Sequence, residues 1–263
     1  MKINPKIKAY AIIALIALLI PISINWFTFL AHFFSDGNDT PVNPLEYKIL
    51  TDSTAAVSNC LLLETDTISI PEKAHIKGNE YTVTKIEKKA FSYCRRLTNI
   101  EIPKSVTSIG YSAFENCSNL TNIDIPVSVT NISYSAFKNC SNLTNINIPA
   151  NVTSIEEGTF NGCFQLNNVE IPASVTKIGY SAFSNCSRLK SIKIPTSIEK
   201  IEDSAFRNCS GLKNIEIPES VINIGYSAFA GCSNLNVVIN NSKDDVVVGE
   251  DAFKGCKSVR YTK

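Results

Sequence analysis

The sequence predicts an elongated solenoid made of repeated 23-residue coils and preceded by one hydrophobic helix. Phenylalanine recurs at this spacing from Phe91 to Phe229, and cysteine does so from Cys94 to Cys232. Proline forms a third column that begins at Pro103. A unit of this length is too short to enclose a core alone, whereas stacked units bury a continuous one. The spacing therefore predicts a single array of stacked coils.

Each unit contains two short extended segments. In Leu97–Pro103, Ile100 and Ile102 alternate with polar residues, which is typical of a strand buried on one face. Proline ends this strand because it has no N–H to donate to a neighbouring strand. A second apolar pair, Val106 and Ile109, is predicted to turn inward on a further short strand or bend. Stacking would join the first strands into a parallel sheet on the concave side of the solenoid.

The segment before each repeat cysteine predicts one helical turn. In Tyr111–Asn116, Ala113 and Phe114 would occupy the core. From Cys117 onward the residue immediately before the cysteine is Asn or Gly, and these are the two types that readily adopt a positive φ. This column is therefore predicted to be left-handed and to end the helical turn. Its members are Asn116, Asn139, Gly162, Asn185, Asn208, Gly231 and Gly255.

The two ends of the array depart from the 23-residue pattern. Upstream, a nine-residue insertion contains His75–Tyr81, which predicts a hairpin. Downstream, the proline is missing and the step from Cys232 to Cys256 is one residue longer than usual. Terminal repeats of a solenoid are modified because they must shield its open ends. We expect an atypical N-terminal cap repeat at residues 47–90, regular repeats at 91–239, and an irregular last repeat with a C-terminal cap at 240–263.

The first 46 residues predict a membrane anchor and a linker. Ala9–Phe34 contains no Lys, Arg, Asp or Glu, and as a helix it is long enough to cross a hydrocarbon layer of about 30 Å. Lys2, Lys6 and Lys8 precede it, which favours a cytoplasmic N-terminus and repeats outside the cytoplasm. We expect a cytoplasmic basic N-terminus at residues 1–8, a transmembrane signal anchor at 9–34 and a polar linker at 35–46.

The complete unit reads C-x-x-L-x-x-I-x-I-P-x-x-V-x-x-I-x-x-x-A-F, and it resembles the BspA-type leucine-rich repeat of bacterial cell surfaces and some parasites. The match covers about residues 60–259, with substitutions such as Thr159 for Ala and Ile198 for Val. The resemblance implies a leucine-rich-repeat solenoid without a cofactor and a role in adhesion to host or neighbouring-cell proteins. The family motif describes the framework, so it assigns no catalytic or ligand-binding residue.

The composition argues against nucleic-acid binding and catalysis. The formal charge is +1, and residues 36–263 hold 22 basic and 24 acidic residues, whereas nucleic-acid binding usually requires a strongly basic surface. No glycine-rich phosphate loop is present. The two histidines, His32 and His75, lie outside the regular array, where they cannot activate a repeat Cys or Ser. We expect no enzyme activity, cofactor, small-molecule substrate or nucleic-acid partner.

The cysteine column admits three interpretations, which are disulfides between neighbours, metal ligation and packing. Equivalent cysteines on adjacent coils would lie about one strand spacing apart, close enough for disulfides. However, each precedes a predicted core Leu by three residues, and a straight column does not converge on a metal ion. A buried free cysteine behaves as a small hydrophobe. We therefore predict reduced, inert thiols and no metal site.

The fold does not explain two columns of polar or aromatic residues. Tyr111, Tyr134, Tyr180 and Tyr226 recur three residues before a core Phe, and exposed tyrosines can anchor partners; the alternative is ordinary solvated surface. The outward strand positions vary among Asn, Asp, Glu and Lys while the framework stays constant, which favours recognition of a partner. The predicted binding residues are Asn99, Glu101, Asn122, Asp124, Asn145, Asn147, Asn168, Glu170, Lys193 and Glu216.

Together these features predict a non-enzymatic cell-surface binding module. Its repeat face would adhere to or recognise another protein or surface macromolecule, and residues 9–34 would hold it in the membrane. The competing interpretation is a structural spacer or a subunit-docking scaffold in the producer's own envelope. Variation between repeats at the outward positions favours recognition, whereas a uniform face would favour the spacer.

The anchor is predicted to stay attached to the mature protein. The alternative is a signal peptide with Ala9–Ile20 as its apolar core, which would leave a secreted protein, but Pro21–Phe29 contains no small-x-small cleavage site. N-terminal sequencing of protein extracted from membranes should therefore give the original N-terminus. A mature start between residues 21 and 45 would show that the segment is removed.

Overall fold

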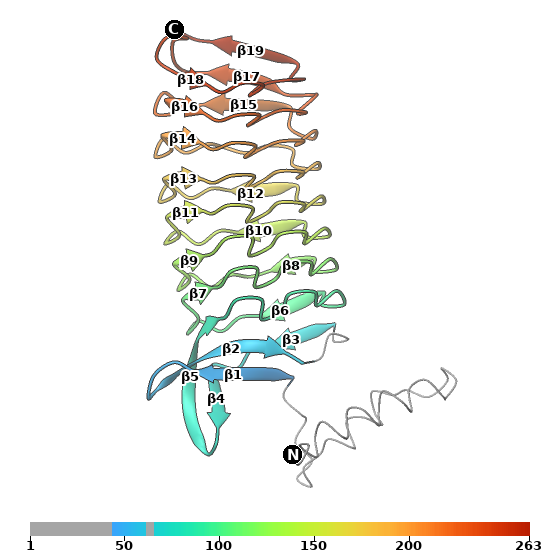
Figure 1. Ribbon diagram of the computed structural model, residues 1–263, viewed down its shortest axis with the longest axis vertical. Helices are drawn as coiled ribbons and strands as arrows, with labels where there is room; N and C mark the ends of the chain where they lie inside the picture. Colours follow the sequence, from blue (N-terminus) through green and yellow to red (C-terminus); the bar gives the residue numbers. More distant parts are fainter. Residues whose placement is uncertain (1–43, 62–65) are drawn as a thin grey trace, which may run out of the picture. The chain divides into compact units, whose positions relative to one another are not determined.

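The computed structural model describes residues 44–61 and 66–263. The predicted basic N-terminus and anchor, and the linker as far as residue 43, lie outside the described residues. Within the described part of the chain, no helix is long and apolar enough to cross a membrane. Residues 44–263 form one compact unit, in which successive coils are stacked one above the other (Figure 1).

Two columns of short parallel strands run along the stack (Figure 1). In the first column β3 pairs with β6, β10 lies between β8 and β12, and β17 lies between β15 and β19. Their central residues face one another in register, as Ile146 does with Val169. The first column comprises β3 (Thr67–Ser69), β6 (Asn99–Glu101), β8 (Asn122–Ile123), β10 (Asn145–Asn147), β12 (Asn168–Glu170), β15 (Asn214–Ile217), β17 (Asn236–Ile239) and β19 (Ser258–Tyr261).

The second column confirms that the apolar pair after the proline, such as Val106 and Ile109, turns into the core, with its isoleucine on a short strand. Its strands are mostly two residues long, with isoleucine paired to isoleucine, as in Ile178 with Ile155 and Ile201. The second column comprises β5 (Asn79–Ile86), β7 (Ser108–Ile109), β9 (Asn131–Ile132), β11 (Ser154–Ile155), β13 (Lys177–Ile178), β14 (Lys200–Ile201), β16 (Asn223–Ile224) and β18 (Val247–Val248).

The N-terminal end of the stack differs from the coils above it. β1 (Leu45–Ile49) pairs antiparallel with β2 (Thr54–Cys60), and β2 continues the second column by pairing with β5. The predicted hairpin is present, because β4 (Lys73–Ile76) pairs antiparallel with β5. Its turn contains Lys77 at φ 51° and Gly78 at φ 83°, the conformation that a two-residue hairpin requires.

The segment Tyr111–Asn116 forms consecutive tight turns, and not the predicted helical turn. Its N–H groups alternate between two kinds of acceptor. Glu115 donates to the Ser112 carbonyl of its own coil at 3.1 Å. Phe114 donates to the Ala136 carbonyl of the next coil at 2.8 Å. A helix would satisfy these groups within one segment, whereas the alternation joins successive coils at this corner.

Two columns of left-handed residues accompany this alternation. The predicted Asn/Gly column is confirmed, for example at Asn116 with φ 62° and Gly162 with φ 76°. A second column, four residues earlier, was not predicted. It holds Ser112 at φ 50° and Gly158 at φ 62°. The sequence could have indicated this column, because a glycine replaces serine at one of its positions. The other serines in this column are Ser135, Ser181, Ser204 and Ser227.

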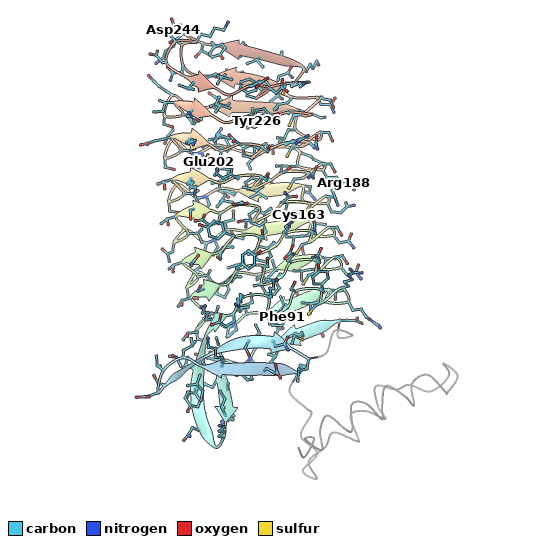
Figure 2. All side chains as sticks on the ribbon, viewed as in Figure 1. Phe91, Cys163, Arg188, Glu202, Tyr226 and Asp244 are labelled. Carbon is cyan, nitrogen blue, oxygen red and sulfur yellow. The ribbon has the colours of Figure 1, made fainter. Side chains whose placement is uncertain are left out.

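Stacked phenylalanines form the centre of the core. The rings from Phe91 to Phe253 follow one another at centroid distances of 5.1 to 5.7 Å, most of them nearly parallel. The rings from Phe91 to Phe229 are almost completely buried. Figure 2 shows Phe91 and Cys163 within the stack. Truncating a buried Phe to Ala typically costs about 3–5 kcal/mol, so the aromatic stack is a major source of stability.

In the described part of the chain no disulfide joins the nine cysteines, and all but Cys256 are buried, which agrees with the packing interpretation. They also form a hydrogen bond that the packing interpretation did not include. Cys140 Sγ donates to the Phe114 carbonyl of the preceding coil at 3.1 Å, and Cys163 Sγ donates to Phe137 in the same way at 3.2 Å. The thiol column therefore links the turn of one coil to the aromatic column of the coil before it.

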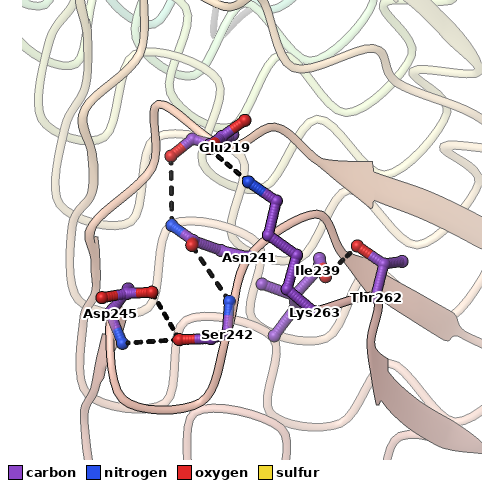
Figure 3. A network of polar contacts seen from close by, with 7 residues as sticks. All are labelled: Glu219, Ile239, Asn241, Ser242, Asp245, Thr262 and Lys263. Atoms are coloured by element: carbon purple, nitrogen blue, oxygen red, sulfur yellow. Dashed lines mark hydrogen bonds and ion pairs between the residues drawn. The ribbon is translucent and has the colours of Figure 1, made fainter.

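The last coil replaces the proline turn by a polar loop at residues 240–245 (Figure 3). Asn241 donates to the Glu219 carbonyl at 3.2 Å and accepts a hydrogen bond from Ser242 N–H at 3.0 Å. Lys263 forms an ion pair with the Glu219 side chain. These contacts attach the end of the chain to the preceding coil and carry charge to the outer edge, which discourages pairing with another strand.

The buried thiols predict a loss of stability at alkaline pH. Burial raises the pKa of Cys163 to about 12, so the folded protein keeps a proton that the unfolded chain releases near pH 9. The free energy of unfolding should therefore fall as pH rises from about 9 toward 12, by up to about 1.4 kcal/mol per pH unit for each such thiol.

The Cys163→Ala variant isolates this effect. Chemical denaturation of both proteins between pH 8 and 11 should give a shallower decline for the variant, whatever its stability at neutral pH. Parallel declines for the two proteins would show that Cys163 keeps an ordinary pKa in the folded state.

Candidate interaction surface

All ten residues of the predicted binding face are exposed in the structure. Eight of them lie on strands of the first column, where the parallel register aligns equivalent residues, and Asp124 directly follows β8. Lys193 lies between β12 and β15, two residues after Ser191, which forms an isolated parallel bridge with Asn168. Asn145 lies between Asn122 and Asn168, and Asn147 lies beside Glu170. We call this surface the strand face.

The strand face contains an amide row and a variable row. The amide row includes Asn122 and Asn145, and its side chains bond to their own sheet. Asn145 Nδ2 donates to Thr144 Oγ1 at 3.2 Å, and the single hydrogen of Thr144 Oγ1 is shared between Asn122 Oδ1 at 3.3 Å and the Thr121 carbonyl at 3.2 Å. At the far end of the stack, Asn236 Nδ2 donates to Asn214 Oδ1 at 3.2 Å. The amide row is therefore partly structural, and differences between coils come mainly from the variable row.

The variable row extends beyond the six coils identified from the sequence. Pairing in register places Ser69 beside Glu101 at one end and Arg260 beside Val238 at the other. Within the row, Glu216 accepts a hydrogen bond from Asn240 at 2.5 Å, so part of its charge is used by the last coil. The complete row is Ser69, Glu101, Asp124, Asn147, Glu170, Lys193, Glu216, Val238 and Arg260.

A third row, which the sequence analysis did not include, changes the charge of the strand face. It precedes the amide row and begins with threonines whose hydroxyls bond to the preceding coil, as Thr144 Oγ1 does to the Thr121 carbonyl at 3.2 Å. In later coils exposed Lys190 and Lys213 replace the threonines. The sequence could have indicated this row, because the run Arg188–Lys193 holds three cations in six residues.

The strand face is therefore divided by charge along the stack. Earlier coils carry an acidic sector, and later coils carry a basic sector whose side chains are all exposed. Figure 2 shows Arg188 at the right-hand edge of the stack. The acidic sector consists of Glu101, Asp124 and Glu170. The basic sector consists of Lys190, Lys193 and Lys213, with Arg188 at its edge. Arg96 stands at the same coil position as Arg188 beside the acidic sector, where it forms an ion pair with Asp66.

The tyrosine column lies just beyond the second column, two residues after the end of a second-column strand in each of its coils. Tyr111, Tyr134, Tyr180 and Tyr226 are each between 46% and 48% exposed, so about half of every ring is covered by the protein and half faces solvent. The carboxylates in this region are not all solvated. Glu202 is buried and lies 2.9 Å from Lys200, and Figure 2 places it on the left-hand side of the stack.

Among the residues that the structure describes, no group of three or more His, Cys, Asp or Glu side chains could hold a metal ion. The two surfaces present amide, charged and aromatic side chains.

Comparison with known proteins identifies the repeat family that forms these surfaces. A family model described as BspA type leucine rich repeat region matches in six copies, over residues 74–190 and 130–260. No curated protein matches the chain.

Two solved structures are similar to this chain. The leucine rich repeat protein of T. pallidum is 29% identical, with a TM-score of 0.66, and the match covers 74% of this chain and 90% of that one. A leucine-rich repeat protein from Bacteroides ovatus is also 29% identical, with a TM-score of 0.55, and the match covers 85% of this chain and 71% of that one. These similarities support the solenoid and leave the ligand to be inferred from the surface.

Proposed function

Because the chain belongs to the BspA-type leucine-rich repeat family, we propose that it is a non-enzymatic module that binds another protein through its strand face. Leucine-rich repeats stack into extended surfaces that suit protein recognition. The hydrophobic segment at residues 9–34 would hold the module in a membrane with the repeats outside the cytoplasm. On this proposal the protein acts in adhesion or recognition at the cell surface.

The division of charge on the strand face carries the proposal. Glu101 and Asp124 lie on neighbouring coils of the acidic sector, and Lys190 and Lys193 lie on a single coil of the basic sector. Between these two pairs of residues, Thr144 bonds to Thr121 and Asn122 of the preceding coil without the help of a charged side chain. Complementary potentials accelerate encounter and select partners. A partner with the opposite order of charges along its surface fits this face best.

The alternative is a spacer or a docking scaffold in the producer's own envelope. The bonded amide row favours it, since uniform asparagines that hold the sheet together need no partner. A spacer would tolerate charge reversal on the strand face without any loss of binding, so the two functions can be separated by mutation.

The test compares charge reversals on purified full-length protein in detergent. A partner is first selected from a panel of extracellular matrix and bacterial surface proteins. Glu101→Lys with Asp124→Lys, and separately Lys190→Glu with Lys193→Glu, should then each weaken its binding by about tenfold, which corresponds to about 1.4 kcal/mol. Both should also reduce the dependence of affinity on salt.

The matched control is Glu157→Lys with Glu250→Lys, which makes the same change of charge at exposed positions outside the strand face. It should leave the affinity unchanged. Equal affinity of all three variants, with the fold intact by circular dichroism, would favour the spacer. A loss confined to the control would move the binding site to the tyrosine side.

A further inference from the structure

The tyrosine side of the solenoid has a regular surface that the proposed function does not use. We call it the tyrosine row. It runs along the stack beside the second column and places aromatic and acidic residues at one position of successive coils. Its members are Tyr111, Tyr134, Glu157, Tyr180, Asp203 and Tyr226.

The backbone under the tyrosine row is rigid. The Gly158 N–H donates to the Tyr180 carbonyl at 2.8 Å, and the Ser204 N–H donates to the Tyr226 carbonyl at 2.8 Å. Three residues after each member of the row, a buried Phe takes its place in the aromatic stack. The tyrosines are thus held at fixed spacing before any ligand binds, which lowers the entropic cost of binding.

In the second half of the row, coils that carry a carboxylate lie in close contact with the coils that carry a tyrosine. Gly179 precedes Tyr180, and a Cβ at this glycine would lie 2.8 Å from the Glu157 nitrogen. Asp203 Oδ1 accepts a hydrogen bond from the Tyr226 N–H at 2.8 Å. Tyr226 is therefore bonded through its N–H to the carboxylate of Asp203, and the residue before Tyr180 packs against the backbone of Glu157.

The distance between tyrosines along the row matches the repeat distance of a linear polymer. Tyr134, Tyr180 and Tyr226 are two coils apart, and with phenylalanine rings 5.1 to 5.7 Å apart on successive coils their separation is roughly 10 to 11 Å, close to twice the usual strand spacing. In a β-1,4-linked glycan one sugar advances the chain by about the height of one coil. Adjacent sugars are turned over, so the same face recurs at every second sugar.

The surroundings of the tyrosines favour a sugar over a protein. Protein-binding aromatic anchors usually lie in packed apolar patches that exclude water. The neighbouring strand positions here are polar, and Asn131, Lys177 and Lys200 are exposed. Isolated half-exposed rings between amide, carboxylate and ammonium groups suit a ligand with apolar C–H faces and hydroxyls at its edges.

We propose that the tyrosine row binds a linear β-1,4-linked glycan lying along the stack. The rings of Tyr134, Tyr180 and Tyr226 stack against every second sugar. Glu157 and Asp203 lie between these rings and accept hydrogen bonds from hydroxyls of the intervening sugars. The rigid stack holds these groups at a constant spacing over at least five coils. A longer glycan therefore contacts more of them, and affinity rises with the length of the glycan.

The experiment measures binding of three hexasaccharides to the full-length protein by isothermal titration calorimetry. Cellohexaose and chitohexaose share the β-1,4 linkage and differ in the N-acetyl group, and maltohexaose is the α-1,4-linked control. We expect binding of one or both β-1,4 glycans and none of maltohexaose. Binding of chitohexaose alone would identify an N-acetylated chain as the ligand, and binding of cellohexaose an unsubstituted one.

Two variants test the role of the rings. Tyr134→Ala with Tyr180→Ala should weaken glycan binding by at least about tenfold, whereas Tyr134→Phe with Tyr180→Phe, which keeps the rings, should stay within about threefold of the unmodified protein. Asn147→Arg with Glu170→Arg, on the strand face, should leave glycan affinity unchanged. The last variant keeps this proposal separate from the proposed function.

Three results would overturn the proposal. These are no binding of either β-1,4 hexasaccharide, equal binding of maltohexaose, and full glycan binding by the alanine variant with its thermal unfolding intact. Loss of a protein partner in the alanine variant, without any glycan binding, would assign the row to protein recognition instead.

Discussion

The structure depends on the backbone hydrogen bonds that join successive coils at the turn corner. Alternate N–H groups there donate to the next coil, as Phe114 does to Ala136, and left-handed residues such as Ser112 and Asn116 accompany the change of direction. An N–H that is buried without a partner costs about 1–3 kcal/mol. The corner therefore tolerates only a segment of constant length and conformation. This explains why the spacing from Phe to Cys stays at three residues even in the first and last coils, where the rest of the unit changes length.

Constant coil length aligns every other layer of the molecule. The phenylalanine rings stack, the cysteine thiols reach the carbonyls of the coil before them, and the two strand columns pair in register. The same alignment acts on the surface, because a side chain at one position of the coil lies above its equivalent in the coil below. Both surfaces discussed above are consequences of this alignment, with the charge sectors on the strand face and the tyrosines and carboxylates on the other corner.

Much of this arrangement could be predicted from the sequence, because buried positions in a repeat are constrained in the same way in every coil. Alternation around Ile100 predicted the first strand, and exchange of Asn116 with Gly162 predicted a left-handed column. The prediction of a helical turn was wrong because the pattern of apolar residues does not reveal which carbonyls the N–H groups donate to. The basic sector was missed because Lys190 precedes the alternating strand positions. The function of the strand face stays a prediction.

The central claim is that backbone conformation at the turn corner, more than side-chain contact, selects the residues there. Asn139 tests it, because it has φ 58° and its amide also donates to Asn116 at 3.0 Å. Asn139→Gly and Asn139→Ala both remove that amide. Glycine is normally less stabilising than alanine, but at positive φ the account predicts that the Gly variant unfolds with a free energy about 1 kcal/mol higher than the Ala variant. An Ala variant as stable as the Gly variant, or more stable, in chemical denaturation would contradict the account.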